Sequence, residues 1–481
     1  MNPPFKTADE YKRMWMIAIA FVLAKSSRYG IMNILFNQVK ADYVERQAVM
    51  VLEDMDSKEI LAQDRAHVWH PIMQHTTLEE KELMVIKEAK GTTITDSDGN
   101  VYLDGYGGLW NVNVGYGRQE IADAVYAQMQ QLSYYSQTQA VPSAVALATR
   151  LAEMMPGDLN HVFFTNSGSE SNETAFKIAR QYGRQTFPGQ NRYKIIARYR
   201  GYHGYTMGAL SATGQVARRE KFEPLVPGFL HVEPPIGVNN ASDIEQVILR
   251  EGPETVAAVI AEPVIGGGGI LVPPDDYFPQ VREICDRYGV LMILDEVITG
   301  FGRTGRLFGC EHWGVVPDIM TIAKGISSGY LPLGACVVTP KVFDAFLGEP
   351  GEAQEFSQVA TYGGHPVCCA AALANLDIVM RERLWENSEK VGAYLLERLE
   401  GLDSPFVREV RGKGLMIAVD MMGEDGKDLD AERVGMVQAG IKEKGVLVGR
   451  MSHVLSPGPE HLLFLAPPLI LTEQEADQIV G

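Results

Sequence analysis

The stretch Ile293-Leu294-Asp295-Glu296-Val297 decides the predicted fold, because an apolar run ends there in two adjacent carboxylates. The five residues 290–294, with the sequence VLMIL, are all apolar and show no polar alternation. Such a run is typical of a strand that is buried on both faces of a parallel sheet. Because α/β folds bind their ligands at the carboxyl ends of such strands, the sequence predicts a site around Asp295.

A lysine follows a second run of this kind. Residues 319–323 are followed directly by Lys324, which stands beside Gly325. An acid and an amine at the ends of neighbouring strands suit pyridoxal 5'-phosphate, since lysine forms the Schiff base and an aspartate keeps the pyridine nitrogen protonated. The alternative interpretation is a surface acid pair and a solvated lysine. These two segments alone leave both interpretations open.

Length and composition limit the classes of protein to consider. A chain of 481 residues exceeds a single hydrophobic core, so we expect two domains. The net charge of -18 argues against a nucleic-acid partner. No two of the ten histidines are four residues apart, so we expect no metal site. The scattered cysteines also lack metal-ligand spacing and indicate reduced thiols in the cytoplasm, namely Cys285, Cys310, Cys336, Cys368 and Cys369.

The first residues carry a short apolar run, Trp15 to Ala24, behind Lys12 and Arg13. This run is too short to span a bilayer, so we expect no membrane segment. Basic residues before an apolar run also fit a signal peptide, but Lys25 interrupts the place where a cleavage site would stand. We therefore interpret residues 1–49 as an extension of uncertain status, or as an extra helix at a subunit interface.

A phosphate site is predicted at Ser167-Gly168-Ser169, which follows two aromatic residues and opens a helix expected over 173–182. Backbone N–H groups at a helix start bind phosphate well, and the hydroxyls add donors. The alternative is an ordinary serine N-cap.

Three further segments add candidate residues. Tyr202 and His203 stand between glycines, where an aromatic ring can lie flat on a planar ligand. Glu262 ends another buried run, and Trp110 stands in a glycine-rich loop, where we expect it to form a wall of a substrate pocket. Strands alternate with helices across residues 160–325, which predicts a mostly parallel sheet covered by helices.

The segment Gly300 to Gly305 matches G-x-G-x-x-G and raises the alternative of an NAD-dependent dehydrogenase. A nucleotide-binding helix should follow, but residues 307–314 contain glycine interruptions and no apolar stripe. No second strand ends in an acid about 20 residues further on. The pattern therefore disfavours a dehydrogenase.

Together these segments resemble the class III aminotransferases, a family of fold-type I enzymes that use pyridoxal phosphate. The motifs that carry the resemblance are Ser167-Gly168-Ser169-Glu170, Gly201-Tyr202-His203-Gly204, Glu262-Pro263, Asp295-Glu296-Val297, Gly300-Phe301-Gly302-Arg303, Lys324-Gly325, Thr361-Tyr362-Gly363-Gly364-His365-Pro366 and Ala466-Pro467-Pro468. The resemblance implies a large cofactor-binding domain over 119–365. It also implies a smaller α+β domain from both chain ends, with residues 50–118 and 366–481.

The resemblance also implies residue roles. Lys324 is the Schiff-base lysine and proton shuttle, and Asp295 pairs with the pyridine nitrogen. Val297 and Tyr202 pack on the two faces of the ring. The other cofactor-binding residues would be Ser167, Gly168, Ser169, His203, Glu262 and Thr361. Because Thr361 would reach in from a second subunit, the resemblance implies a homodimer or a dimer of dimers.

The donor and the acceptor are predicted less directly. Relatives that use α-carboxylate or ornithine-like donors often carry an arginine where this chain has Phe464-Leu465. Arg450 aligns instead with an arginine that binds the carboxylate of a keto acid acceptor in the ω-amino acid:pyruvate group. Trp110 and residues 67–71 resemble members that use taurine and pyruvate. β-Alanine and other ω-amines are the alternative donors, and a non-catalytic ligand-binding relative of the fold is the rival class.

Overall fold

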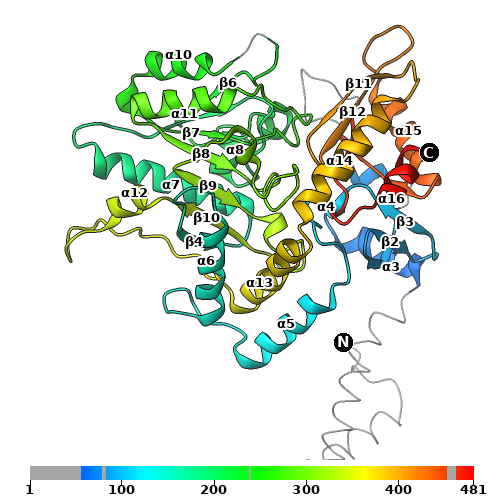
Figure 1. Ribbon diagram of the computed structural model, residues 1–481, viewed down its shortest axis with the longest axis horizontal. Helices are drawn as coiled ribbons and strands as arrows, with labels where there is room; N and C mark the ends of the chain where they lie inside the picture. Colours follow the sequence, from blue (N-terminus) through cyan, green and yellow to red (C-terminus); the bar gives the residue numbers. More distant parts are fainter. Residues whose placement is uncertain (1–55, 78–82, 238–239, 452–461) are drawn as a thin grey trace, which may run out of the picture. The chain divides into compact units, whose positions relative to one another are not determined.

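The computed structural model describes residues 56–77, 83–237, 240–451 and 462–481 (Figure 1). The chain divides into two compact units, 1–86 and 87–481. In the first unit, helix α3 (Ser57–His67) begins where the Asp56 side chain accepts a hydrogen bond from the Glu59 N–H, and the 3-10 turn η1 (His75–Thr77) follows. The extension predicted over residues 1–49 lies outside the described residues.

A seven-stranded sheet organises the second unit, in the order β4-β10-β9-β8-β7-β5-β6 (Figure 1). Only β10 runs antiparallel to its neighbours β9 and β4, while the other neighbouring strands are parallel. The predicted α/β fold with a mostly parallel sheet is therefore confirmed. The strands are β4 (His161–Thr165), β5 (Lys194–Arg198), β6 (Phe229–Val232), β7 (Val256–Ala261), β8 (Leu291–Asp295), β9 (Ile319–Ile322) and β10 (Gly334–Val338).

Helices cover both faces of this sheet, which explains the continuous apolar runs in its strands. Met292 and Leu294 pack into one core cluster, whereas Leu291 and Ile293 pack into another on the opposite face. The first cluster includes α6 (Pro142–Met154), α10 (Ser242–Glu251), α11 (Tyr277–Tyr288) and α13 (Pro366–Arg381). The second includes α7 (Gly168–Thr186), α8 (Met207–Ala212) and α12 (Pro340–Phe343). Helix α7 begins five residues earlier than predicted, directly at Gly168.

Strands from both ends of the chain share a second, smaller sheet. It has the order β1-β2-β3-β13, and β13 (Val446–Leu447) pairs in parallel with β3 (Val101–Asp104). β2 (Thr93–Asp96) and β3 form a hairpin, and β1 (Ile86–Lys90) adds a third strand. This pairing confirms that both chain ends build the smaller α+β part. The exact domain boundaries stay a prediction.

A third sheet, β11-β12-β15-β14, completes the C-terminal part. Its elements are β11 (Val407–Gly412), β12 (Ile417–Met421), β14 (Gly449–Met451) and β15 (Leu462–Leu465). The accompanying helices are α14 (Leu384–Glu400), α15 (Ala431–Glu443) and α16 (Glu473–Val480), while α5 (Gln119–Gln131) packs against α13. Thr472 and Glu475 form a capping box on α16.

Two properties of the described ranges concern membrane segments and the state of the cysteines. No helix within them combines the length and the apolar character that crossing a bilayer requires. All five cysteines are buried free thiols.

The glycine segment 300–305 is a turn beyond β8, followed by the 3-10 turn η4 (Gly309–Trp313) rather than by an α-helix. Its Arg303 is fully buried. The guanidinium of Arg303 donates to the Leu415 carbonyl (3.0 Å), the Pro467 carbonyl (2.5 Å) and the Asn113 side chain (3.0 Å). Arg303 therefore ties the central sheet to the segments that frame the smaller sheets.

Replacing Arg303 by Met should lower the free energy of unfolding by about 3 kcal/mol, because two buried carbonyls and one amide would lose a charged donor. Arg306→Met is the matched control, since the exposed Arg306 forms a surface ion pair with Glu389 and its loss should cost about 0–1 kcal/mol. Urea denaturation measures both. Equal losses in the two variants would contradict the role assigned to Arg303.

Candidate active site

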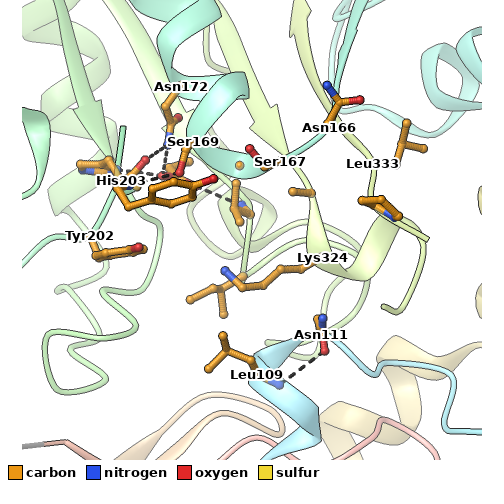
Figure 2. A pocket seen from close by; sticks show the side chains of 18 of the residues that line it. Leu109, Asn111, Asn166, Ser167, Ser169, Asn172, Tyr202, His203, Lys324 and Leu333 are labelled. Atoms are coloured by element: carbon orange, nitrogen blue, oxygen red, sulfur yellow. Dashed lines mark hydrogen bonds and ion pairs between the residues drawn. The ribbon is translucent and has the colours of Figure 1, made fainter. Parts of the chain in front are cut away.

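The carboxyl ends of β4, β5, β7, β8 and β9 meet at one edge of the central sheet, where a cavity of about 470 Å³ opens. Segments that lie far apart in the sequence come together there (Figure 2). Nine residues predicted from the sequence line this cavity: Ser167, Gly168, Ser169, Tyr202, His203, Glu262, Asp295, Val297 and Lys324.

Asp295 ends β8 and is held by three donors. Its Oδ2 accepts hydrogen bonds from His203 Nδ1 and Asn172 Nδ2, both at 2.8 Å. Its Oδ1 accepts the Val297 N–H at 3.1 Å. Because Asp295 is only 3% exposed, these bonds offset the cost of burying a carboxylate and fix its orientation at the cavity wall.

The neighbouring Glu296 is not part of the cavity wall. Successive side chains at the end of a strand point in opposite directions, so Glu296 turns away from Asp295. Its carboxylate accepts the N–H groups of Gly309 (2.9 Å) and Cys310 (2.8 Å), and the Thr299 hydroxyl. Burial raises the pKa of Glu296, while these hydrogen bonds oppose the rise. Glu296 thus anchors the turn behind the site.

Lys324 follows β9 and extends into the cavity (Figure 2). Its φ of 45° lies in the left-handed region, which costs a non-glycine residue about 1 kcal/mol. The amine has no hydrogen-bond partner among the described residues. Burial lowers the pKa of Lys324, and the negative charges of Asp295 and Glu262 oppose that shift. A lysine with a lowered pKa supplies a nucleophile and proton acceptor closer to neutral pH.

The start of α7 forms a cradle for an anion. The Ser167 side chain caps the helix by accepting the Glu170 N–H, and the N–H groups at the helix start lie beside the cavity. Glycine is required at 168, because a Cβ there would lie 2.9 Å from both Val297 methyl groups. The close approach brings the cradle next to the loop that follows Asp295.

Glu262 holds the loop that carries Tyr202. One carboxylate oxygen accepts the Tyr202 N–H at 3.0 Å, and the other accepts the Gly266 N–H at 2.9 Å. Burial raises the pKa of Glu262. The Arg218 guanidinium lies 5.2 Å from the centre of the Tyr202 ring. Two loops beyond neighbouring strands are therefore fixed by one buried carboxyl group.

At Trp110 the structure corrects the sequence-based placement. The indole is 6% exposed and stacks on the Phe464 ring, with 4.4 Å between centroids, so it does not line the cavity. Its neighbours Leu109 and Asn111 line the cavity instead. The physical reason is the backbone: Gly107, Gly108 and Trp110 all have positive φ, and this turn directs the indole into the core.

Two other predicted residues also lie outside the cavity wall. Arg450 stands on β14 and donates to the Ala431 carbonyl at 2.6 Å. Thr361 is exposed, and its carbonyl accepts a hydrogen bond from the Tyr134 hydroxyl at 2.7 Å. The single chain thus gathers the predicted cofactor residues except Thr361, and it brings neither predicted substrate residue to the site.

Asn172, Leu109 and Asn111 are among the lining residues that the sequence-based prediction did not single out. Asn172 bonds to Asp295. The sequence feature that could have indicated this residue is its position as a polar side chain about one helical turn after Ser169, on the buried face of α7. Leu109 and Asn111 lie on the far side of Lys324 from Ser169 (Figure 2). Nothing in their loop distinguished them from Trp110. Within the described ranges, no three His, Cys, Asp or Glu side chains are grouped to hold a metal ion.

The lowered pKa of Lys324 predicts how its reactivity depends on pH. Only the neutral amine attacks an aldehyde, so labelling of Lys324 by a small aldehyde and borohydride should rise with pH and reach half its maximum at a lower pH than labelling of exposed lysines. Glu262→Gln should move that midpoint still lower, because a charge that favours the ammonium is removed. Mass spectrometry of the peptides measures both, and a midpoint at or above that of the exposed lysines would contradict the assignment.

Comparisons with known proteins agree with this geometry. The model of the aminotransferase class III family matches residues 76–481. An uncharacterized aminotransferase of Bacillus subtilis (strain 168) is 46% identical over 90% of this chain and 97% of that protein. A taurine–pyruvate aminotransferase of Bilophila wadsworthia (strain 3_1_6) is 43% identical over 89% of this chain and 96% of that protein.

A solved aminotransferase of Bacillus anthracis shares the fold, with a TM-score of 0.84 and 44% identity over 89% of this chain and 98% of that one. The matched region contains the whole central sheet and every residue that lines the cavity. The chain therefore belongs to the class III aminotransferases.

Proposed function

We propose that this aminotransferase moves the amino group of taurine to pyruvate, which gives sulfoacetaldehyde and L-alanine. The observation that carries the choice of substrates is the similarity, over nearly the whole chain, to a protein named for that reaction. The amino donor and the keto acid would share the cavity around Lys324 in turn. β-Alanine and other ω-amines are the alternative donors.

Enzymes of this family use pyridoxal 5'-phosphate, and the residues at the cavity fit this cofactor. The N–H groups at the start of α7 and the Ser169 hydroxyl suit a phosphate dianion. The fixed carboxylate of Asp295 suits a protonated pyridine nitrogen, and the amine of Lys324, which has no hydrogen-bond partner in the described part of the chain, suits an aldehyde. Tyr202 and Val297, both at the cavity wall, are the residues that would contact the two faces of the ring.

When bound, the cofactor supplies an electron sink that lets a proton leave the donor's amino-bearing carbon. Lys324 would hold the cofactor covalently at rest and, once displaced by the donor amine, accept that proton at Nζ. Asp295 would keep the ring nitrogen protonated. His203 would keep Asp295 in place, and Glu262 would keep the Tyr202 backbone in place.

The donor is tested by a panel of taurine, β-alanine, putrescine and 4-aminobutyrate, each with pyruvate. Taurine should give the highest kcat/KM, and alanine should form without added NAD. Lys324→Ala should lower turnover more than about 10³-fold, because the covalent link and the proton acceptor are lost together. Lys341→Ala is the control, since Lys341 pairs with Asp318 away from the cavity. No alanine from taurine, with turnover of another donor, would reject taurine.

Arg450 is proposed to bind the carboxylate of pyruvate, by analogy with the ω-amino acid:pyruvate group. In the structure its guanidinium bonds to a backbone carbonyl, so this role requires the side chain to leave that carbonyl. Arg450→Ala should raise the KM for pyruvate about 10-fold or more and leave the first half-reaction with the donor nearly unchanged. Stopped-flow absorbance separates the two half-reactions, and an unchanged pyruvate response would reject the proposal.

A homodimer is proposed, with Thr361 acting on the phosphate in the partner's site. Thr361 is exposed and lies outside the cavity of its own chain. Exposed apolar side chains near it in the sequence and in space are those of Val359 and Tyr362, and the Tyr362 ring lies 5.9 Å from that of Tyr134. Apolar side chains exposed together mark surfaces that other proteins cover.

Mixing two inactive variants tests whether Thr361 acts across the dimer. Lys324→Ala and Thr361→Ala subunits, refolded together in equal amounts, should recover about a quarter of wild-type activity. Half of the dimers would be mixed, and each mixed dimer would hold one intact site. If Thr361 acts within its own chain, no intact site forms and activity stays at the level of the separate variants.

A further inference from the structure

We propose that Asn172 is a positioning residue for the end of the cofactor that carries the ring nitrogen. Its amide would fix the Asp295 carboxylate so that one acceptor position stays directed at that nitrogen. The inference rests on the proposed role of Asp295 and adds a residue to which no role was assigned. It is carried by the hydrogen bonds around Asn172 and by the position of this residue on α7.

Asn172 is 1% exposed, and all of its amide groups are engaged. Nδ2 donates to Asp295 Oδ2 at 2.8 Å and to the His203 carbonyl at 2.7 Å. Oδ1 accepts the Thr321 hydroxyl at 2.8 Å. A buried amide is costly unless it is fully bonded, so this placement is specific. Because the Asp295 carboxylate and the His203 carbonyl only accept hydrogen bonds, the amide NH2 must face them, and Oδ1 is left to accept the Thr321 hydroxyl.

The number of donors around Asp295 explains what Asn172 accomplishes. A carboxylate offers about four acceptor positions. Among the described residues three are occupied, two on Oδ2 by His203 and Asn172 and one on Oδ1 by the Val297 N–H, which leaves one position on Oδ1 of a residue that lines the cavity. Without Asn172 a second position would open on Oδ2, and rotation of the carboxylate would be opposed by one donor fewer. The geometry thus suits a single N–H donor from the ligand.

The position of Asn172 on α7 links the two ends of the site. Ser169 lies at the helix start beside the cavity, and Asn172 follows three residues later on the same buried face. Three residues of helix rise about 4.5 Å. A single rigid helix therefore places the anion cradle and the support of Asp295 at a fixed separation, so the phosphate and the ring nitrogen are positioned by one element.

Thr321 belongs to the same arrangement from the opposite side. It is fully buried on β9, next to the strand that ends in Asp295, and its hydroxyl reaches the amide oxygen of Asn172. Thr321 does not touch the cavity. Loss of the hydroxyl, which bonds to Asn172, should therefore act on the cofactor through Asn172, and this gives the proposal a second test.

The main experiment compares Asn172→Leu with wild type as holoenzymes. Leu has a similar size but no donor. We expect the cofactor to dissociate about 10-fold faster and kcat to fall about 10-fold, with a less than 2-fold change in the KM for pyruvate, as for the loss of one charged hydrogen bond. The pH dependence of the visible absorbance of the bound cofactor should also shift.

Thr174→Val is the matched control. Thr174 is fully buried on the same helix and bonds to the Glu170 carbonyl and to Gln358, but it does not touch Asp295. It should lower Tm and leave the absorbance, its pH dependence and the cofactor dissociation rate unchanged. If Asn172→Leu changes only Tm, as the control does, Asn172 is merely structural and the proposal is overturned.

If Asn172→Leu does not fold, variants of Thr321 test the proposal instead. Thr321→Val should reproduce the faster dissociation and the shifted pH dependence, and Thr321→Ser, which keeps the hydroxyl, should restore both. A Thr321→Val enzyme with wild-type cofactor properties overturns the proposal. The variant Asp295→Asn distinguishes failure of this inference from failure of the proposed role of Asp295. If it loses activity and Asn172→Leu does not, only this inference fails, whereas wild-type behaviour of Asp295→Asn removes the role of Asp295 and the inference with it.

Discussion

The site depends on keeping the charged Asp295 carboxylate in a place from which water is almost excluded. Burying such a group without partners costs several kcal/mol, so its donors are a condition of the fold as much as of the chemistry. The donors come from α7, from the loop after β5 and from the turn after β8. Three elements distant in sequence must therefore be correctly packed before the carboxylate is stable, which couples the site to the central sheet.

Close backbone approaches make this convergence possible. A Cβ at Gly168 would strike Val297, and one at Gly204 would lie 2.5 Å from the Ser169 hydroxyl. A Cβ at Gly325 would lie 2.5 Å from the Asn113 amide. Glycine at these positions lets the helix start and the loops beyond the strands come within contact distance of one another. These glycines in the motifs are thus required by packing, because a larger side chain would not fit at this edge of the sheet.

Much of the fold could be predicted, because a strand buried on both faces leaves a continuous apolar run and a helix leaves a 3.6-residue period. The strand before Asp295 followed from such a local rule. Trp110 and Asn172 did not. The first depends on positive backbone φ at Gly107, Gly108 and Trp110, and the second depends on which strand end faces the helix.

The sequence by itself determined which reactive and binding groups the protein has. These are an acid and an amine at strand ends and a serine–glycine helix start, while the nucleotide-binding helix of a dehydrogenase was not indicated. Only the tertiary structure decided which of these groups meet. Strand order places β4, β5, β7, β8 and β9 with their carboxyl ends at one edge, and this order is set by packing of helices on both faces, which no local pattern encodes. The same packing turns Asp295 toward the cavity and Glu296 away from it, although the sequence presents them as equal neighbours.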